Sequence, residues 1–185
     1  MRRQPVFVVF LLLLSAVGCS ERDEDVERAP LPAEAMEEDR VEAERLFHQG
    51  MKLEEQKRMV EAYELWKKGM ARDGRNYPLV NHVAWFLAVS APKELQNHKA
   101  ALPLARQAVR LSGWKRNNVI DTLAEVYFLH GKYGKAVRTQ QRALLPGVEG
   151  GCSASYLRRQ IRKYEAAHAE FKRAPHTTEI ELERE

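Results

Sequence analysis

Two cysteines, six histidines and one pair of acids are the residues of this chain that could perform chemistry. Asp121 and Glu125 stand four positions apart, which places them on one face of a helix, but catalysis by paired carboxylates needs a partner across a cleft. The histidines lack the spacing of metal ligands; they are His48, His82, His98, His130, His168 and His176. The sequence therefore predicts no catalytic residue, no metal site and no cofactor.

Cys152 is the one thiol with a setting that suggests reactivity. It lies in Gly150-Gly151-Cys152-Ser153, before a predicted helix whose dipole could lower the pKa of a thiol. No His and Asp arrangement accompanies it, and Gly150-Gly151 lacks the preceding strand and following Lys of a nucleotide site. We interpret Cys152 as structural or exposed. An enzyme that uses this thiol, or the acid pair, is kept as an alternative hypothesis.

The first eighteen residues have the pattern of an export signal. Met1-Arg2-Arg3 is basic and Val6 to Leu14 is apolar. The small residues Ser15-Ala16-Val17-Gly18 then precede Cys19. The apolar run is shorter than the roughly 20 residues of a spanning helix. The last stretch resembles a bacterial lipobox, which implies a lipid on Cys19. Ser20 then implies the outer membrane, with the protein facing the periplasm. A soluble secretory signal is the alternative.

Charge divides the rest of the chain into three parts. Residues 21–44 hold eleven acids and three bases, whereas residues 45–173 hold 24 Lys and Arg against 11 Asp and Glu, a net of +13. Residues 174–185 hold four acids and one base. We predict a disordered acidic tether over 19–41, a folded domain over 42–173, and a disordered acidic tail over 174–185.

Pairs of small residues recur in amphipathic patterns and predict an all-α fold. They are Gly50 with Ala62, Ala84 with Ala101, and Ala124 with Ala136; Ala108 and Ala143 continue the pattern. The separations of 34 between Gly50 and Ala84 and 35 between Ala101 and Ala136 indicate repeated hairpins. Small residues are needed where helices cross closely. Ser153 to Lys172, with Leu157, Ile161, Tyr164 and Phe171 on one face, is predicted to cap the stack.

The motifs Asn81-His82-Val83-Ala84-Trp85 and Asp121-Thr122-Leu123-Ala124-Glu125-Val126-Tyr127 resemble tetratricopeptide (TPR) repeats. The resemblance covers residues 43–146. It implies a right-handed α-solenoid of about three hairpins whose first helices form a concave, peptide-sized groove. By this resemblance the groove contains Phe47, His48, Met51, Asn81, His82, Trp85, Asp121, Thr122, Glu125 and Phe128. The two acids favour a basic or mixed segment with an apolar anchor as ligand. Alternatively, Trp85 and Phe128 only pack against neighbouring repeats.

The second hairpin departs from the pattern. Ala84 and Ala124 are 40 positions apart, with the extra residues in Ser90 to Asn97. Pro103 lies in the predicted second helix of this hairpin, where its missing N–H predicts a kink or a late helix start. An irregular hairpin is expected here.

The second helices and the cap are predicted to carry a basic outer surface. Its residues are Lys99, Arg106, Arg110, Lys135, Arg138, Arg142, Arg158, Arg159 and Arg162. Three interpretations of this surface are open. It is only solvated, it attracts anionic headgroups or an acidic partner, or the chain's own acidic ends screen its charge. The export signal argues against nucleic acid as a partner.

Together these features favour a non-enzymatic, membrane-anchored scaffold or adaptor of the bacterial cell envelope, which holds a protein or peptide in its concave groove. The alternatives are the periplasmic thiol or carboxylate enzyme, or an organiser of lipid surfaces that uses the basic convex face.

Overall fold

The structure is a computed structural model that describes residues 33–174, with side chains from Met36 onward. By its contacts the chain divides into two units, Met1–Leu31 and Pro32–Glu185, and every described residue belongs to the second. The predicted export signal, Cys19 and the tether up to residue 32 lie outside the described residues, as does the tail from Pro175.

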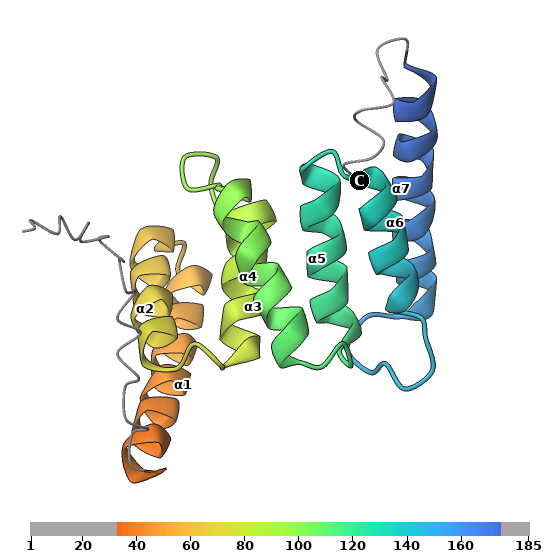
Figure 1. Cartoon of the computed structure of the whole chain (residues 1–185). Helices are drawn as coiled ribbons and strands as arrows, with labels where there is room; N and C mark the ends of the chain where they lie inside the picture. The colour runs from red at the N-terminus through yellow and green to blue at the C-terminus, as the bar shows by residue number, and fades with distance from the viewer. Residues whose placement is uncertain (1–32, 175–185) are drawn as a thin grey trace, which may run out of the picture. The chain divides into compact units, whose positions relative to one another are not determined.

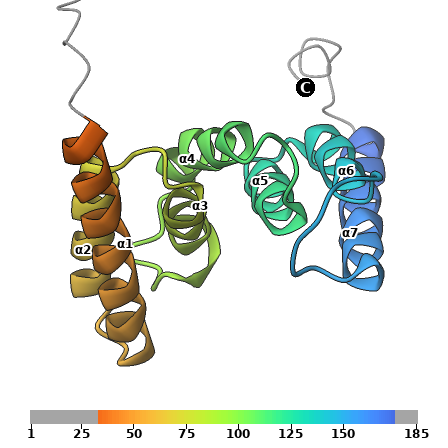
Figure 2. The same ribbon diagram turned by 90° about the horizontal axis from the view of Figure 1, so that it is seen from below.

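The described residues form helices that follow one another in chain order (Figure 1). They are α1 (Ala33–Glu55), α2 (Met59–Arg72), α3 (Tyr77–Trp85), the π-helix η1 (Phe86–Ser90), α4 (His98–Leu111), α5 (Asn117–Leu129), α6 (Tyr133–Arg142) and α7 (Ala154–Arg173). Helix α1 packs on α2, α3 on α4, and α5 on α6, while α7 covers α6. Figure 2 shows α3 and α5 on one side of the row and α4 and α6 on the other. The predicted stack of helical hairpins with a final capping helix is confirmed.

The predicted small residues lie inside the packed part of the domain. Ala62, Ala84, Ala101, Ala108, Ala124 and Ala136 are fully buried, and Ala143 is 3% exposed. At Gly50, a Cβ atom would collide with the indole of Trp66, which donates its Nε1–H to the Phe47 carbonyl over 3.2 Å. The absence of a side chain at Gly50 therefore leaves space for the indole of Trp66, which fills the interior of the first hairpin.

Helix α1 begins earlier than expected. It starts at Ala33, so residues 33–41 of the predicted tether are helical. Arg40 pairs with Glu37 three positions earlier, and Arg45 donates to Glu42 in the same way. Arg72 of α2 reaches Asp39 over 3.2 Å. Local ion pairs of opposite sign support a helix, which an acid count alone does not reveal.

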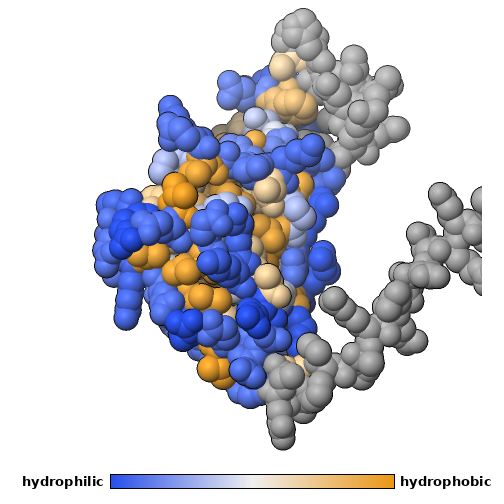
Figure 3. Space-filling view, turned by 90° about the vertical axis from the view of Figure 1, so that its left-hand side faces the viewer, coloured by the Kyte–Doolittle hydropathy of each residue, from blue (hydrophilic) through white to orange (hydrophobic). Residues whose placement is uncertain are grey.

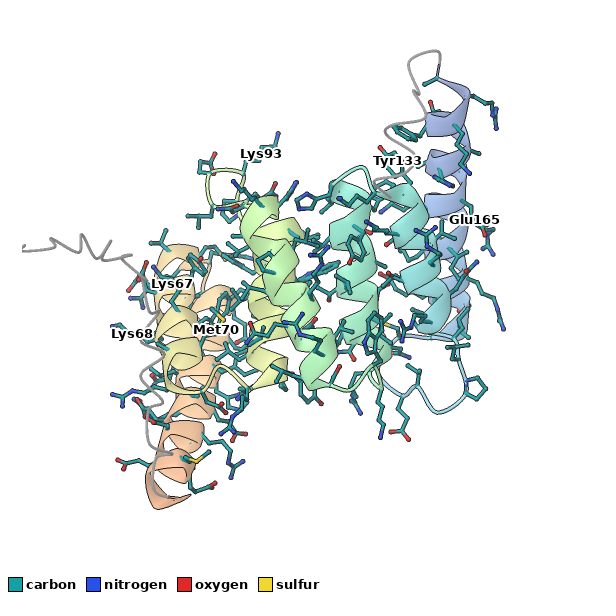
Figure 4. All side chains as sticks on the ribbon, in the orientation of Figure 1. Lys67, Lys68, Met70, Lys93, Tyr133 and Glu165 are labelled. Carbon is teal, nitrogen blue, oxygen red and sulfur yellow. The ribbon has the colours of Figure 1, made fainter. Side chains whose placement is uncertain are left out.

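The first hairpin closes one end of the stack with a mixed surface. Its outer face carries hydrophobic side chains among hydrophilic ones (Figure 3), and Val41 and Val60 are among the exposed ones. On α2, Met70 lies on the side toward α3 and α4, where it packs against the core, and Lys68 lies on the opposite side (Figure 4).

The second hairpin is irregular, as the sequence predicts. Helix α3 passes at Phe86 into the π-helix η1, and the Ala91 N–H donates to the Phe86 carbonyl over 2.9 Å. Pro103 lies inside α4, which begins at His98, so of the two expected outcomes, a kink or a late start, the late start is wrong. The Asn97 side chain accepts from the Ala100 N–H over 3.0 Å and fixes that start.

The capping helix is anchored at its beginning. Ser153 Oγ accepts from the Tyr156 N–H over 3.3 Å, so Ser153 is the N-cap residue of α7. Leu157 and Tyr164 are buried, whereas Glu165 lies on the outer side of α7 (Figure 4). None of the described helices is long and apolar enough to cross a membrane.

Candidate functional site: a groove along the first helices

A groove of about 490 Å³ runs along the first helices of the hairpins. Its walls come from α1, α3, α5 and the start of α7, and none of the residues that line it belongs to α2, α4 or α6. The lining residues are Phe47, Tyr77, Pro78, Asn81, His82, Trp85, Arg116, Asn118, Val119, Asp121, Thr122, Cys152 and Tyr156. The face expected to form a groove is therefore hollowed.

Six of the ten predicted groove residues line it, namely Phe47, Asn81, His82, Trp85, Asp121 and Thr122. His48, Met51, Glu125 and Phe128 do not. His48 is exposed on α1, and Met51 packs against the core. The ring centroids of Phe128 and Tyr164 lie 5.1 Å apart, so Phe128 packs against the capping helix α7.

Asp121 lines the groove, but its carboxylate is engaged by the protein. Gln140 Nε2 donates to Oδ1 over 2.6 Å, and the Tyr156 hydroxyl donates to Oδ2 over 3.1 Å. Burial raises the pKa of Asp121 above its ordinary value, although the two donors act in the opposite direction. The residue is 6% exposed, so little of this acid is open to a ligand.

Glu125 is held by the capping helix. Lys163 Nζ lies 2.8 Å from its carboxylate, and the Tyr164 hydroxyl donates to it over 2.7 Å. The buried Tyr164 has its pKa raised by desolvation and by this bond. Both acids thus join α5 to its neighbours. The sequence argument that they select a basic ligand loses its support.

The α3 wall combines aromatic rings with an unsatisfied amide. His82 Nε2 lies 3.0 Å from Glu54 Oε2, and its ring stands edge-on to Trp66 with centroids 4.5 Å apart. Burial lowers the pKa of His82, although Glu54 acts to raise it. Beside it, Asn81 Oδ1 is buried and has no hydrogen-bond partner within residues 33–174. A ligand group that donates a hydrogen bond to Asn81 Oδ1 would satisfy this acceptor.

The α7 end of the groove is built by a pinned loop. Asn117 Nδ2 donates to the Cys152 carbonyl over 3.0 Å, and the Cys152 N–H donates to Asn117 Oδ1 over 3.1 Å. Gly150 adopts φ +143°, and a Cβ atom there would collide with Asn117. A backbone bridge joins Arg116 to Glu149. These contacts set Cys152 and Tyr156 against the groove.

The surroundings of the thiol in this loop disfavour its thiolate form. Burial raises the pKa of Cys152, and the nearby Asp121 raises it further. Asp121 and Glu125 do not form a carboxylate pair, since each of them bonds to other residues. Among the described residues no group of three His, Cys, Asp or Glu is placed to hold a metal ion.

Seven lining residues were absent from the sequence-based groove. Tyr77, Pro78, Asn118 and Val119 lie one helical turn before predicted residues, so the 3.6-residue period could have found them. Arg116, Cys152 and Tyr156 gave no such signal, because a loop folds them into place.

The predicted basic residues lie on α4, α6 and α7, and several rest on aromatic rings. The Arg142 guanidinium lies 3.6 Å from the ring centroid of Trp114, and Arg106 donates to the Tyr127 hydroxyl over 3.2 Å. Arg159 lies 5.5 Å from the ring centroid of Tyr156. Lys135 and Arg138 also have interaction partners. The remaining predicted residues, Lys99, Arg110, Arg158 and Arg162, are exposed.

The arrangement of hairpins matches a known architecture. A solved structure of the first TPR of Spaghetti (RPAP3), bound to the HSP90 peptide SRMEEVD, aligns with a TM-score of 0.58 and 23% identity. The alignment covers 70% of this chain and 95% of that one. Comparisons with protein-family models and with curated proteins give no match. The chain thus has the fold of a TPR domain, a solenoid built from helical hairpins.

Proposed function

We propose that this domain binds an extended segment of a partner protein in the groove along α1, α3, α5 and α7. The observation that carries the proposal is that the lining residues come from the first helices of the hairpins, from the capping helix, and from loop positions just before α5 and α7. A continuous hollow across several hairpins suits a chain laid along it. The TPR structure similar to this domain contains a bound peptide, which supports the same use here.

The groove indicates which features the segment needs. Phe47, Tyr77 and Trp85 offer ring surface for an apolar side chain. Asn81 Oδ1 lacks a donor, and a backbone N–H of an extended chain supplies one. We propose a segment with one large apolar anchor that donates a main-chain hydrogen bond to Asn81.

The experiment is a binding assay with pools of labelled octapeptides in which one position is fixed. Pools with Leu, Ile or Phe at that position should raise fluorescence anisotropy. Trp85→Ala should weaken the binding by about tenfold, as expected for a central aromatic contact. Leu111→Ala is the control, because Leu111 is an exposed apolar residue outside the groove. Equal binding by the wild type and Trp85→Ala would contradict the proposal.

We also propose that the domain acts at the bacterial cell envelope. A lipid on Cys19 anchors it to the membrane, and it binds its partners in the periplasm. The support is the lipobox-like sequence that ends at this residue. Intact mass of the membrane fraction should show a diacylglycerol-modified Cys19 as the first residue. Cys19→Ser should release the protein from membranes. An unmodified mature chain would overturn the anchor and leave the groove proposal standing.

A further inference from the structure

The α5–α7 end of the groove carries a positively charged side chain. Arg116 lines it and makes no ion pair with a described acid. Arg159 stands beside the Tyr156 wall. Residues 98–174 hold 15 Lys and Arg against 5 Asp and Glu, a net of +10. Because the protein itself engages Asp121 and Glu125, this end attracts acids close to the ring surface of α3.

A segment of the chain itself carries the complementary pattern. Residues 179–184 read Glu-Ile-Glu-Leu-Glu-Arg. In an extended strand successive side chains point to opposite sides, so Ile180 and Leu182 would share one side and three glutamates the other. The acid-rich stretch 21–28 offers only Val26 as an apolar residue. The tail therefore fits a groove of rings and arginines better than the tether does.

We propose that the chain's own tail, Glu179 to Glu183, occupies the groove. Ile180 or Leu182 lies against the α3 rings, and a glutamate pairs with Arg116. This proposal rests on the proposed function, since it uses the same groove. It makes the domain self-occupied until a partner segment displaces the tail.

The lengths allow it. The 17 residues from Tyr156 to Arg173 span about 26 Å at the helical rise. The nine residues from Arg173 to Leu182 span about 30 Å when extended. A tail that turns back along α7 thus brings Leu182 level with the Tyr156 wall.

The first experiment places the photoreactive residue benzoylphenylalanine at position 182 of the full chain. Irradiation and mass spectrometry should find cross-links to α3 or α5 within one chain. Cross-links to α4 or α6 would place the tail on the convex basic surface and overturn the proposal. A cross-linked product of twice the mass would show that the tail of another copy occupies the groove, which also overturns the proposal.

Charge reversal tests the electrostatic contact. Arg116→Glu should lower the cross-linked fraction by up to about fivefold, the range for a partly exposed ion pair. Lys115→Glu is the matched control, since it makes the same charge change next door at a residue that does not line the groove. Equal loss in both variants would mean that only overall charge matters and would contradict a contact at Arg116.

Competition separates this inference from the proposed function. A tethered segment has an effective concentration of about 1 mM, so a tail with a Kd of about 0.1 mM weakens outside ligands by about tenfold. Removing residues 176–185 should therefore strengthen octapeptide binding by that factor. If peptides bind through Trp85 equally well with and without the tail, the tail proposal fails and the proposed function stands. If no pool binds either protein, the proposed function fails.

Discussion

The first hairpin and the last one place their charges differently. In α1 and α2, acids and arginines pair on the surface, either within one helical turn, as in Glu42 with Arg45, or between the two helices, as in Asp39 with Arg72. The interior is apolar around Trp66. In α5 to α7, two acids point inward, and Asp121 and Glu125 bond to side chains of the neighbouring helices.

The difference shows what each charge can determine. An exposed pair only adds local support, because water and salt screen it. A carboxylate that is largely removed from water must have its donors in place, so it fixes the position of the helix that supplies them. Helix α7 is therefore set by Tyr156 and Tyr164, and the groove gains a wall with a defined position.

Trp66→Ala should have the largest effect, since it empties the centre of the apolar hairpin. We expect a loss of about 3–5 kcal/mol in the free energy of unfolding, measured in urea. Gly50→Ala should cost about 1–3 kcal/mol through overpacking against the indole. In the Trp66→Ala background the cost of Gly50→Ala should vanish. An additive double variant would mean that the two residues do not share this space.

Glu125→Ala tests the inward acids. It leaves the buried Tyr164 hydroxyl without its acceptor, and we expect a loss of about 1–3 kcal/mol in urea unfolding. Lys163→Met removes only the half-exposed partner of the same acid and should cost less than about 1 kcal/mol. The reverse order would show that the ion pair, and not the hydroxyl bond, holds α7.

Asp121→Asn should be tolerated, with a change within about 1 kcal/mol at neutral pH. Gln140 Oε1 is buried and has no hydrogen-bond partner in the described part of the chain, and rotation of that amide would let Oε1 accept from the new Asn. Burial raises the pKa of Asp121 above 3.8, so the native state keeps a proton that the unfolded state loses first. Wild-type stability relative to Asp121→Asn should therefore fall as the pH rises above that value. Urea titrations of both proteins at several pH values measure it, and a constant difference would contradict the raised pKa.

The smallest effect belongs to the surface pairs. Arg45→Ala and Arg58→Ala remove the partners of Glu42 and Glu61. Both groups are solvated, so the urea midpoint should stay unchanged within error. A clear shift in either variant would erase the contrast between the two hairpins.

The sequence was sufficient to predict the architecture. Small residues at a period near 34 marked the helix crossings, and Ser153 marked the start of the cap. These signals are local or periodic, so they can be recognised in a single amino-acid sequence. The irregular second hairpin was also foreseen, because Ser90 to Asn97 exceeded the repeat length.

The roles of the acids were beyond such reasoning. Asp121 and Gln140 are 19 positions apart, and Glu125 and Tyr164 are 39 apart. No spacing rule links residues so distant, and the loop that brings Tyr156 to the groove depends on Asn117. Likewise, the acid-rich start of α1 suggested a tether, because a charge count overlooks the pairing of Glu37 with Arg40.

Tyr156 is both a wall of the groove and a donor to the buried Asp121. A change at this position alters ligand choice and the seating of the final helix together. The Oδ1 atom of Asn81, by contrast, accepts no hydrogen bond from any described residue, so a change there does not disturb such a contact. New ligand preferences are thus most freely acquired from the α3 side, and engineering of this domain should begin there.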